Sequence, residues 1–268
     1  MNKYLFLSDI DGTLLRGESG IGPGVKKAAQ EFMDYGGLLA LCTGRSHVST
    51  AWVAKELNIQ IPCVIFSGAA IYDFIKKEFI WARPMENHVL ESIKKVYDLY
   101  PDISIQIYTK DDIYLIRSNE HLDKYGVQEE LSDSLTKLSD VKGEILKIVL
   151  VSKNRTLLAE CGNEVFDKEY FHFEFASRHF TEIVASGTGK GNALHKLAQH
   201  YNVDIKNTFA AGDGMTDLPM LQAAGFSFAP EDAAQSLLDA CNMKIPPCEQ
   251  GGMEQAFNYA IEKIKSNL

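Results

Sequence analysis

The sequence predicts an α/β fold whose core is a doubly wound, Rossmann-like parallel sheet, with a second α+β domain inserted into it. Three observations support this prediction. Short apolar runs alternate with helical patterns at the start of the chain, the same alternation returns in its last third, and paired strands occupy the part between. Strands that alternate with helices are typical of a parallel sheet with right-handed crossovers.

The strands expected in the core are short, apolar and followed by polar or glycine-rich turns. Residues 4–7 read as a strand that is buried on both faces, as in a parallel sheet. Further core strands are expected at residues 38–42, 62–66, 208–211 and 226–229. Helical patterns end at Gly36 and near Leu57, and others cover residues 192–201, 218–224, 232–241 and 253–264.

The middle of the chain has a different pattern. Helices are expected at residues 86–100, 119–131 and 155–166, and strands at 103–108, 113–117, 144–152 and in two stretches of 170–185. The strands at 103–108 and 113–117 read as an antiparallel hairpin, which needs only a short turn. We therefore expect a core formed by residues 1–83 and 186–268, and an inserted domain at residues 84–185.

Charge and composition exclude some classes of function. The 268 residues include 27 basic and 36 acidic side chains, so the net charge is −9, which disfavours a nucleic-acid partner because phosphate backbones need a basic face. The five cysteines are scattered and form no Cys-x-x-Cys pair, as in a protein with reduced thiols. Because we find no signal-like segment and no apolar run of membrane-spanning length, we expect a cytoplasmic protein without a membrane partner.

The first expected strand leads directly into Asp9, Asp11 and Gly12. Open α/β sheets bind their ligands at the carboxyl ends of the strands. Two carboxylates this close repel each other, and Mg²⁺ is the cation that suits them best. A plain strand-end turn is the alternative at this point. A calcium loop is excluded, because Gly12 comes two positions too early and Gly20 stands where the late Glu is needed.

Three further polar clusters are expected near this acidic pair. Thr43-Gly44 and the pair Asp213/Asp217 each follow a predicted parallel strand, and Lys190 opens a helix. Because the carboxyl ends of the strands share one edge of the sheet, the clusters should converge there. Carboxylates for a metal, a hydroxyl and amides for an anion, and one ammonium together suit phosphoryl transfer.

These clusters resemble the four motifs of the haloacid dehalogenase superfamily of phosphatases. The motif residues are Asp9-Ile10-Asp11-Gly12-Thr13, Thr43-Gly44-Arg45, Lys190-Gly191 and Gly212-Asp213-Gly214-Met215-Thr216-Asp217. The large insertion between the second and third motifs resembles the α/β cap of the Cof-type subfamily. The resemblance covers the whole chain, and four ordered motifs together are far more specific than any one alone.

The resemblance implies a role for each motif residue. Asp9 would be the nucleophile that forms an aspartyl-phosphate, and Asp11 would act first as general acid and then as general base. Thr43, the amide of Gly44 and the side chain of Lys190 would hold the phosphoryl group.

The same resemblance implies a Mg²⁺ site. Asp9, the backbone carbonyl of Asp11 and Asp213 would bind the metal, and Asp217 would orient metal-bound water or a neighbouring lysine. The sequence departs from the family pattern at Thr216, where the family commonly has Asn, and at Ser67, where it commonly has Asn before Gly-Ala. These two departures put contacts to the phosphate and to the leaving group in doubt.

The expected activity is Mg²⁺-dependent hydrolysis of small phosphorylated metabolites, with sugar phosphates as the first guess. A phosphosugar mutase would use the same aspartate pair, and the motifs do not separate the two. A metal-dependent glycosyltransferase and a non-catalytic phosphate sensor are weaker alternatives. Arg178 and His179, at an expected turn of the inserted domain, would either contact the leaving group or simply face solvent.

Overall fold

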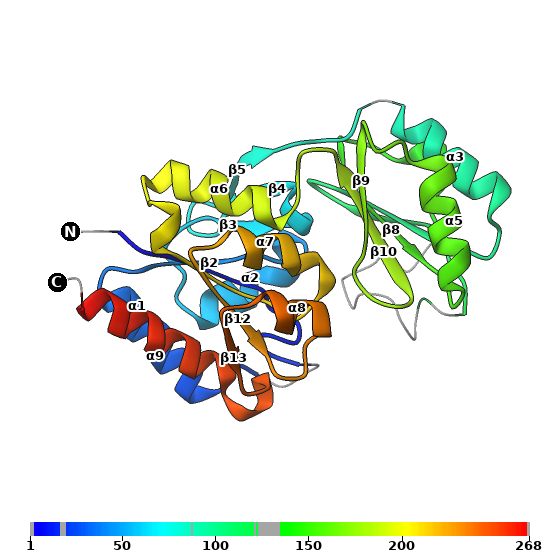
Figure 1. Ribbon diagram of the computed structural model, residues 1–268. Coiled ribbons are helices and arrows are strands. Elements are labelled where there is room, and N and C mark those ends of the chain that lie inside the picture. The colour runs from blue at the N-terminus through cyan, green and yellow to red at the C-terminus, as the bar shows by residue number, and fades with distance from the viewer. Residues whose placement is uncertain (1–2, 17–19, 87, 121, 123–134, 267–268) are drawn as a thin grey trace. The chain divides into compact units, whose positions relative to one another are not determined.

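The computed structural model describes residues 3–16, 20–86, 88–120, 122 and 135–266, and it divides into two compact units (Figure 1). The core unit consists of Met1–Trp81 and Gly189–Leu268, and the inserted unit of Ala82–Thr188. The borders expected from the sequence, at 83/84 and 185/186, lie two and three residues from these divisions.

The main sheet of the core unit has five parallel strands in the order β13-β12-β11-β1-β2. Their bounds are Leu5–Ser8 for β1, Leu38–Leu41 for β2, Thr208–Ala211 for β11, Phe226–Pro230 for β12 and Met243–Ile245 for β13. β1 lies between β2 and β11, and Leu5 is in register with both Leu38 and Thr208. The predicted parallel sheet is therefore confirmed, with the first strand inside it, paired on both sides.

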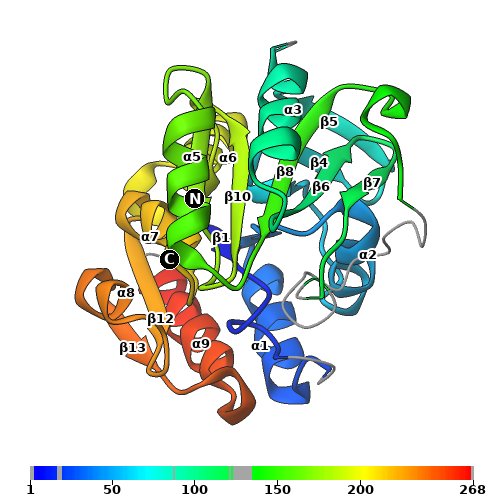
Figure 2. The ribbon, with the colours of Figure 1, turned by 90° about the vertical axis from the view of Figure 1, so that its right-hand side faces the viewer.

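Helices on both faces make this sheet doubly wound, as predicted. α1 and α9 pack against each other on one face, while α6 contacts α7 and α7 contacts α8 on the other (Figures 1 and 2). The helices of the core unit are α1 (Pro23–Asp34), α2 (His47–Glu56), α6 (Lys190–Tyr201), α7 (Leu218–Ala223), α8 (Gln235–Ala240) and α9 (Gly252–Lys265).

An aromatic cluster fixes β1 inside the core unit. Phe6 is fully buried, and the ring centroids of Phe257, Phe228, Phe209 and Phe32 lie 4.8, 5.8, 5.8 and 5.9 Å from its own. Buried aromatic pairs at such separations add to the free energy gained by burial alone. The cluster therefore holds in place the strand that leads into the acidic turn.

The strand expected at residues 62–66 forms as β3 (Cys63–Ile65) and lies beside the end of β2, with a parallel bridge between Cys42 and Val64. It joins β4 (Ala70–Asp73) and β5 (Glu78–Ala82) in a three-stranded sheet and pairs antiparallel with β4. The antiparallel pairing with β4 comes from the turn at Phe66–Gly68, where φ is +51°, +55° and +92° at the three successive residues. This left-handed turn reverses the chain at once, so β4 returns along β3.

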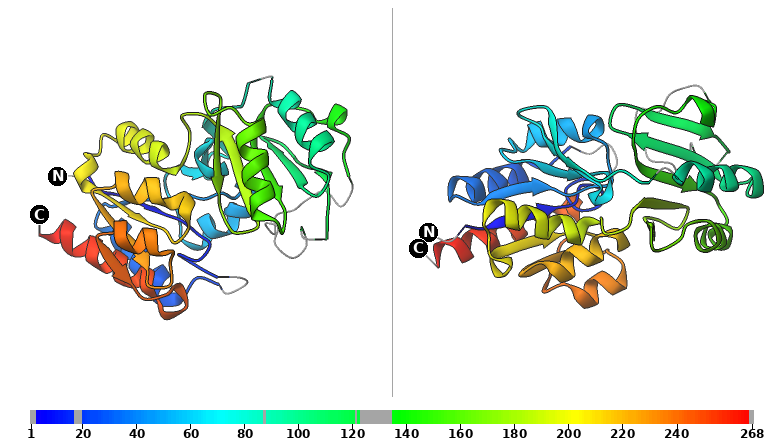
Figure 3. Two further views of the ribbon diagram at one scale, coloured as in Figure 1. Left: turned by 45° about the vertical axis from the view of Figure 1, so that its right-hand side comes forward. Right: turned by 90° about the horizontal axis from the view of Figure 1, so that it is seen from above.

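The inserted unit is a sheet of five strands in the order β7-β6-β8-β10-β9, with antiparallel pairing throughout the described ladders. Its strands are β6 (Ser104–Thr109), β7 (Ile113–Arg117), β8 (Ile145–Val151), β9 (Phe171–Phe175) and β10 (Phe180–Ala185). The helices α3 (Val89–Leu99) and α5 (Arg155–Val165) pack on one face, over isoleucines such as Ile107 and Ile148 (Figure 3). The helix expected at residues 119–131 falls largely outside the described residues.

Short 3₁₀ turns complete the described structure. They are η1 (Phe66–Gly68), η2 (Leu138–Asp140), η3 (Ile205–Asn207), η4 (Met215–Asp217) and η5 (Cys248–Gln250).

Every helix in the described part of the chain is too short or too polar to cross a bilayer. The five cysteines are free thiols, and burial raises the pKa of Cys63 and Cys161 to about 12, which keeps these two protonated at neutral pH.

Candidate active site

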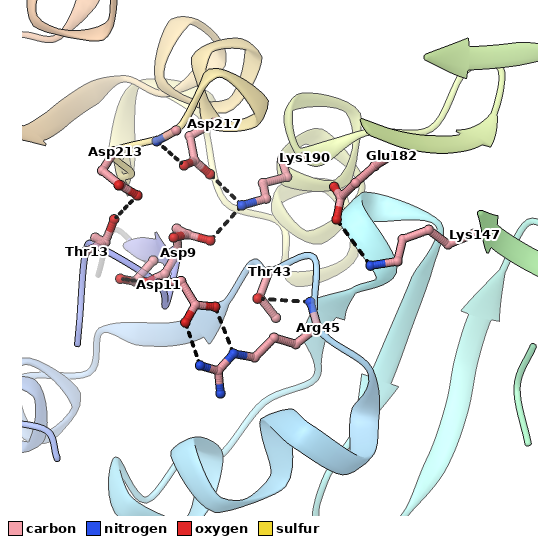
Figure 4. A network of polar contacts seen from close by, with 12 residues as sticks. Asp9, Asp11, Thr13, Thr43, Arg45, Lys147, Glu182, Lys190, Asp213 and Asp217 are labelled. Atoms are coloured by element: carbon pink, nitrogen blue, oxygen red, sulfur yellow. Dashed lines mark hydrogen bonds and ion pairs between the residues drawn. The ribbon is translucent and has the colours of Figure 1, made fainter. Parts of the chain in front are cut away.

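The ends of three neighbouring parallel strands bring the predicted polar residues together (Figure 4). Asp9 follows β1, Thr43 follows β2, and Asp213 follows β11. Asp217 closes the turn η4, and Lys190 is the first residue of α6. The convergence follows from the sheet order, because β1 has β2 on one side and β11 on the other.

Lys190 joins two of the carboxylates. Its Nζ donates hydrogen bonds to Asp9 Oδ1 and to Asp217 Oδ1, both over 2.6 Å. Its side chain is only 4% exposed. Burial alone lowers the pKa of Lys190, but the carboxylates of Asp217 and Asp9 outweigh it and hold the pKa well above its ordinary value. Lys190 is therefore a permanent positive charge beside Asp9.

The carboxylates nevertheless outnumber this single ammonium. Burial, and then repulsion from Asp217, raises the pKa of Asp9 well above its ordinary value, although Lys190 opposes the shift. The same two causes raise the pKa of Asp213 to about 7, against the opposing effects of Lys190 and of a hydrogen bond from Thr13 Oγ1. Buried carboxylates with raised pKa values indicate a site that is short of positive charge.

A hard divalent cation fits this shortage. Oxygen atoms of Asp9, Asp213 and Asp217 lie within 4.8 Å of one another. Such oxygens are the ligands that Mg²⁺ prefers. Both oxygens of Asp217 already accept hydrogen bonds, one from Lys190 and the other from the amide of Gly214 over 3.0 Å. Asp9 and Asp213 are thus the carboxylates best placed to bind a cation, and Asp217 is placed to support them.

Two glycines leave the space that these carboxylates occupy. A Cβ on Gly12 would lie 2.1 Å from Asp213 Oδ2, and φ at Gly12 is +84°, which favours glycine. A Cβ on Gly212 would lie 2.4 Å from the Cβ of Asp217. The glycines of the first and fourth motifs are therefore needed for the packing of the acidic cluster itself.

Thr43 is held rigidly at the end of β2. It is buried, its amide donates to Val64 O over 3.0 Å, and its carbonyl accepts from the amide of Ser67 over 3.0 Å. Its Oγ1 accepts a hydrogen bond from the amide of Arg45 over 3.2 Å. Gly44 lies between Thr43 and Arg45, in the turn before α2. This turn therefore fixes the Thr43 hydroxyl at the end of the strand next to the one that leads to Asp9 (Figure 4).

Asp11 makes a contact with Arg45 that was not predicted from the sequence. Arg45 donates to both of its carboxylate oxygens, from Nε to Oδ2 over 2.8 Å and from Nη2 to Oδ1 over 2.5 Å. Arg45 belongs to the second motif, but no role for it was predicted from the sequence. One feature of the sequence could have indicated this contact. Arg45 follows β2 and Asp11 follows β1, and these two strands are neighbours in the sheet.

The departures from the family pattern have defined places. Ser67 is buried and adopts a left-handed backbone, which Asn tolerates better than Ser. Thr216 is part of η4 and half-buried. In the inserted unit, Arg178 is exposed and lies with His179 in the turn between β9 and β10.

Comparisons with known proteins agree with this geometry. A family model described as haloacid dehalogenase-like hydrolase matches residues 6–257. The 5-amino-6-(5-phospho-D-ribitylamino)uracil phosphatase YitU of Bacillus subtilis is 26% identical, over 93% of this chain and 94% of that protein. The pyridoxal phosphate phosphatase YbhA of Escherichia coli is 24% identical, over 91% and 94%.

A solved structure shows the same fold. It is described as the subclass IIB sugar phosphatase BT4131, and it superposes with a TM-score of 0.84 at 16% identity, over 96% of this chain and 98% of that one. At this identity the likeness concerns the fold alone. Taken with the family match over most of the chain and the phosphatases of similar sequence, it leads to one conclusion: the chain is a phosphatase of the haloacid dehalogenase-like hydrolase family, of the Cof type.

Proposed function

We propose that this phosphatase hydrolyses phosphomonoesters of small metabolites with Mg²⁺, through an aspartyl-phosphate formed on Asp9. The observation that carries the proposal is the 2.6 Å hydrogen bond from Lys190 to Asp9 within a buried acidic cluster. A buried carboxylate that attacks a phosphoryl group needs a positive neighbour, because it and its target are both negatively charged.

In the first half-reaction, an oxygen of Asp9 attacks phosphorus and the bond from phosphorus to the ester oxygen breaks. Asp11 gives its proton to the departing alkoxide. Lys190 neutralises charge on Asp9 and on the phosphoryl oxygens, while Thr43 and the amide of Gly44 donate hydrogen bonds to those oxygens.

In the second half-reaction, the deprotonated Asp11 takes a proton from water as the water oxygen attacks phosphorus. The bond between phosphorus and Asp9 breaks, inorganic phosphate leaves, and Asp11 is protonated again for the next cycle. One carboxylate serves both steps because the proton moves in opposite directions.

Asp9, Asp213 and the backbone carbonyl of Asp11 would hold the cation, with Asp217 supporting them. When bound, Mg²⁺ supplies positive charge that draws the phosphoryl oxygens towards the nucleophile. A cation fits these residues because the pKa values of Asp9 and Asp213 are raised, which indicates that positive charge is short around the two carboxyl groups.

The proteins of similar sequence support the class of substrate. Their names give a ribitylaminouracil phosphate and pyridoxal phosphate, and each of these carries a phosphate on a small polar organic group. Together with the likeness in fold to a sugar phosphatase, they lead us to propose small phosphorylated metabolites, with sugar phosphates tested first. We further propose that the inserted unit is the family's cap and selects the group that carries the phosphate.

A substrate screen tests the proposal. Purified protein with Mg²⁺ is incubated with a panel of sugar phosphates, the two phosphates named above and p-nitrophenyl phosphate, and released inorganic phosphate is measured. We expect release from at least one metabolite, and no release by the Asp9→Asn protein. Isomerised sugar phosphate without free phosphate would instead identify a mutase, and no turnover of any compound would contradict the proposal.

A further inference from the structure

We propose that Arg45 is a positioning residue, which fixes the carboxylate of Asp11 for its two proton transfers. This inference rests on the proposed function, since it assigns Arg45 a task only if Asp11 is the general acid and base.

The contact between the two side chains is bidentate. Nε and Nη2 of Arg45 reach the two oxygens of Asp11 over 2.8 and 2.5 Å. A planar guanidinium that binds a planar carboxylate through two parallel hydrogen bonds fixes both the distance and the orientation of that carboxylate.

Arg45 is itself anchored to neighbouring elements. Its amide donates to Thr43 Oγ1 over 3.2 Å, and its carbonyl accepts from the amide of Phe66 over 3.0 Å. Its Nη1 donates to the carbonyl of Ser49 in α2 over 3.4 Å. Its side chain is 17% exposed. The position of Asp11 is thereby tied to the same turn that carries Thr43.

Asp11 needs such an anchor more than Asp9 does. Its side chain is 57% exposed, against 7% for Asp9, which is packed inside the acidic cluster. An exposed carboxylate has several rotamers and competes with water for each hydrogen bond, and small errors in the position of a catalytic group are costly. Arg45 supplies the constraint that burial supplies for Asp9.

Alkyl and aryl phosphates should differ in how strongly their hydrolysis depends on Arg45. An alkyl phosphate has a poor leaving group, which needs the proton of Asp11. The nitrophenolate of p-nitrophenyl phosphate leaves without a proton. Because kcat/KM reports the steps up to departure of the leaving group, it should depend on Arg45 for the alkyl phosphate and hardly at all for the aryl phosphate.

The experiment measures kcat/KM on both substrates for Arg45→Met, Asp11→Asn and the double variant. We expect Arg45→Met to lower the value for the alkyl phosphate by about 100-fold and the value for the aryl phosphate by about threefold or less. In the Asp11→Asn protein, Arg45→Met should cause no further loss, because its effect passes through Asp11. Arg45→Lys should restore part of the loss, and it serves as the test if the Met variant does not fold.

Arg16→Met is the matched control. Arg16 also makes an ion pair in the core unit, with Asp232 over 2.6 Å, and its loss should leave both substrates within about twofold. Equal losses on the two substrates, or additive losses in the double variant, would show that Arg45 contacts the phosphoryl group and would overturn the inference. If Asp11→Asn itself left alkyl phosphate turnover unchanged, the proposed role of Asp11 would fail instead.

Discussion

Among the described residues, each of the two units buries a lysine, and the two lysines have different surroundings. In the inserted unit, Lys147 of β8 is fully buried, and its Nζ lies 3.2 Å from Glu182 Oε1 and 4.3 Å from the centroid of the Tyr108 ring. In the core unit, Lys190 contacts Asp9 and Asp217 and shares its cluster with Asp213. Burial of the side chain therefore does not distinguish Lys147 from Lys190.

The balance of charge does distinguish them. The Lys147–Glu182 pair joins one ammonium and one carboxylate across neighbouring strands, which is how a buried ion pair is satisfied within a fold. Around Lys190, three carboxylates share one ammonium, and the pKa values of Asp9 and Asp213 are raised as a result. A balanced pair needs no ligand, whereas an unbalanced cluster is completed by one. The following predictions test that difference, from the largest expected effect to the smallest.

The largest effect is expected for Asp9→Asn. The amide keeps the shape of the side chain but is a poor nucleophile, so kcat should fall on the order of 10⁴-fold. Folding should persist, because the change removes one of the mutually repelling carboxylates. Phosphate release and thermal unfolding measure the two quantities. Activity within about tenfold of the wild type would exclude Asp9 as the nucleophile.

Removal of metal should come next. Chelation with EDTA should abolish turnover and Mg²⁺ should restore it, while Ca²⁺, whose coordination is larger and looser, should substitute poorly. Asp213→Asn should raise the Mg²⁺ concentration for half-maximal activity by about 10- to 100-fold. The matched control is Glu182→Gln, a carboxylate of the balanced pair, which should leave the Mg²⁺ requirement unchanged. Full activity in EDTA would refute the cation site.

The two lysines should respond to the same substitution in different ways. Lys190→Met should lower turnover of every substrate by about 100- to 1,000-fold, since the transferred phosphoryl group is common to all. Lys147→Met should instead lower the free energy of unfolding by about 3–5 kcal/mol, because it takes away the buried ammonium that Glu182 contacts.

A second substitution completes that comparison. Lys147→Met combined with Glu182→Met should recover most of the lost stability, since an apolar pair can replace a buried ion pair. Denaturant unfolding and hydrolysis of p-nitrophenyl phosphate by the folded protein measure the two outcomes. If Lys147→Met lowered turnover as much as Lys190→Met while stability stayed constant, charge balance would be the wrong criterion.

The smallest effect concerns pH. Burial and Asp217 raise the pKa of Asp213 to about 7, so the folded protein keeps a proton there that the unfolded chain loses above about pH 4. Folding of the metal-free protein therefore takes up a proton in this window, and its stability should fall as pH rises from about 4 to about 7. Asp9 shifts in the same direction. Melting temperatures in EDTA measure the slope.

The fall of the melting temperature with pH should be measured again with Mg²⁺ present and with the Asp213→Asn protein. Bound Mg²⁺ favours the ionised carboxylates, so it should reduce the fall in melting temperature, and Asp213→Asn should reduce it as well. Equal slopes for the wild type and for Asp213→Asn in EDTA would contradict the raised pKa of Asp213.

The sequence was sufficient to predict most of the fold because most of the core strands are continuous apolar runs. β13 was not predicted, since it has only three residues and Lys244 at its middle. Residues 62–66 lie beside β2 as expected, with a parallel bridge between Cys42 and Val64. The pairing of β3 with β4 was not predicted, because Phe66 and Ser67 adopt a left-handed backbone that composition does not reveal. β5, with exposed and half-buried positions, gave no strong strand pattern.

The candidate site also contains residues that could be predicted from the sequence and one that could not. Residues at strand ends, such as Asp9 and Asp213, are predictable because sheet topology alone brings them together. Arg45 is not, because its contact with Asp11 depends on how a long side chain folds back across two neighbouring turns. The cytoplasmic location, the absence of nucleic-acid and membrane partners and the Mg²⁺ cofactor stay predictions. So do the roles of all the site residues, which are Asp9, Asp11, Thr43, Gly44, Lys190, Asp213 and Asp217.

The place of β1 between β2 and β11 has a consequence for the order in which the molecule is completed. During synthesis, all residues of the inserted unit emerge before Gly189, so β6 to β10 are present while the main sheet has only β1 and β2 of its five strands. Lys190 lies 181 residues after Asp9. Asp9, the proposed nucleophile, therefore cannot meet its ammonium partner until late in translation, and the candidate active site is among the last parts of the molecule to form.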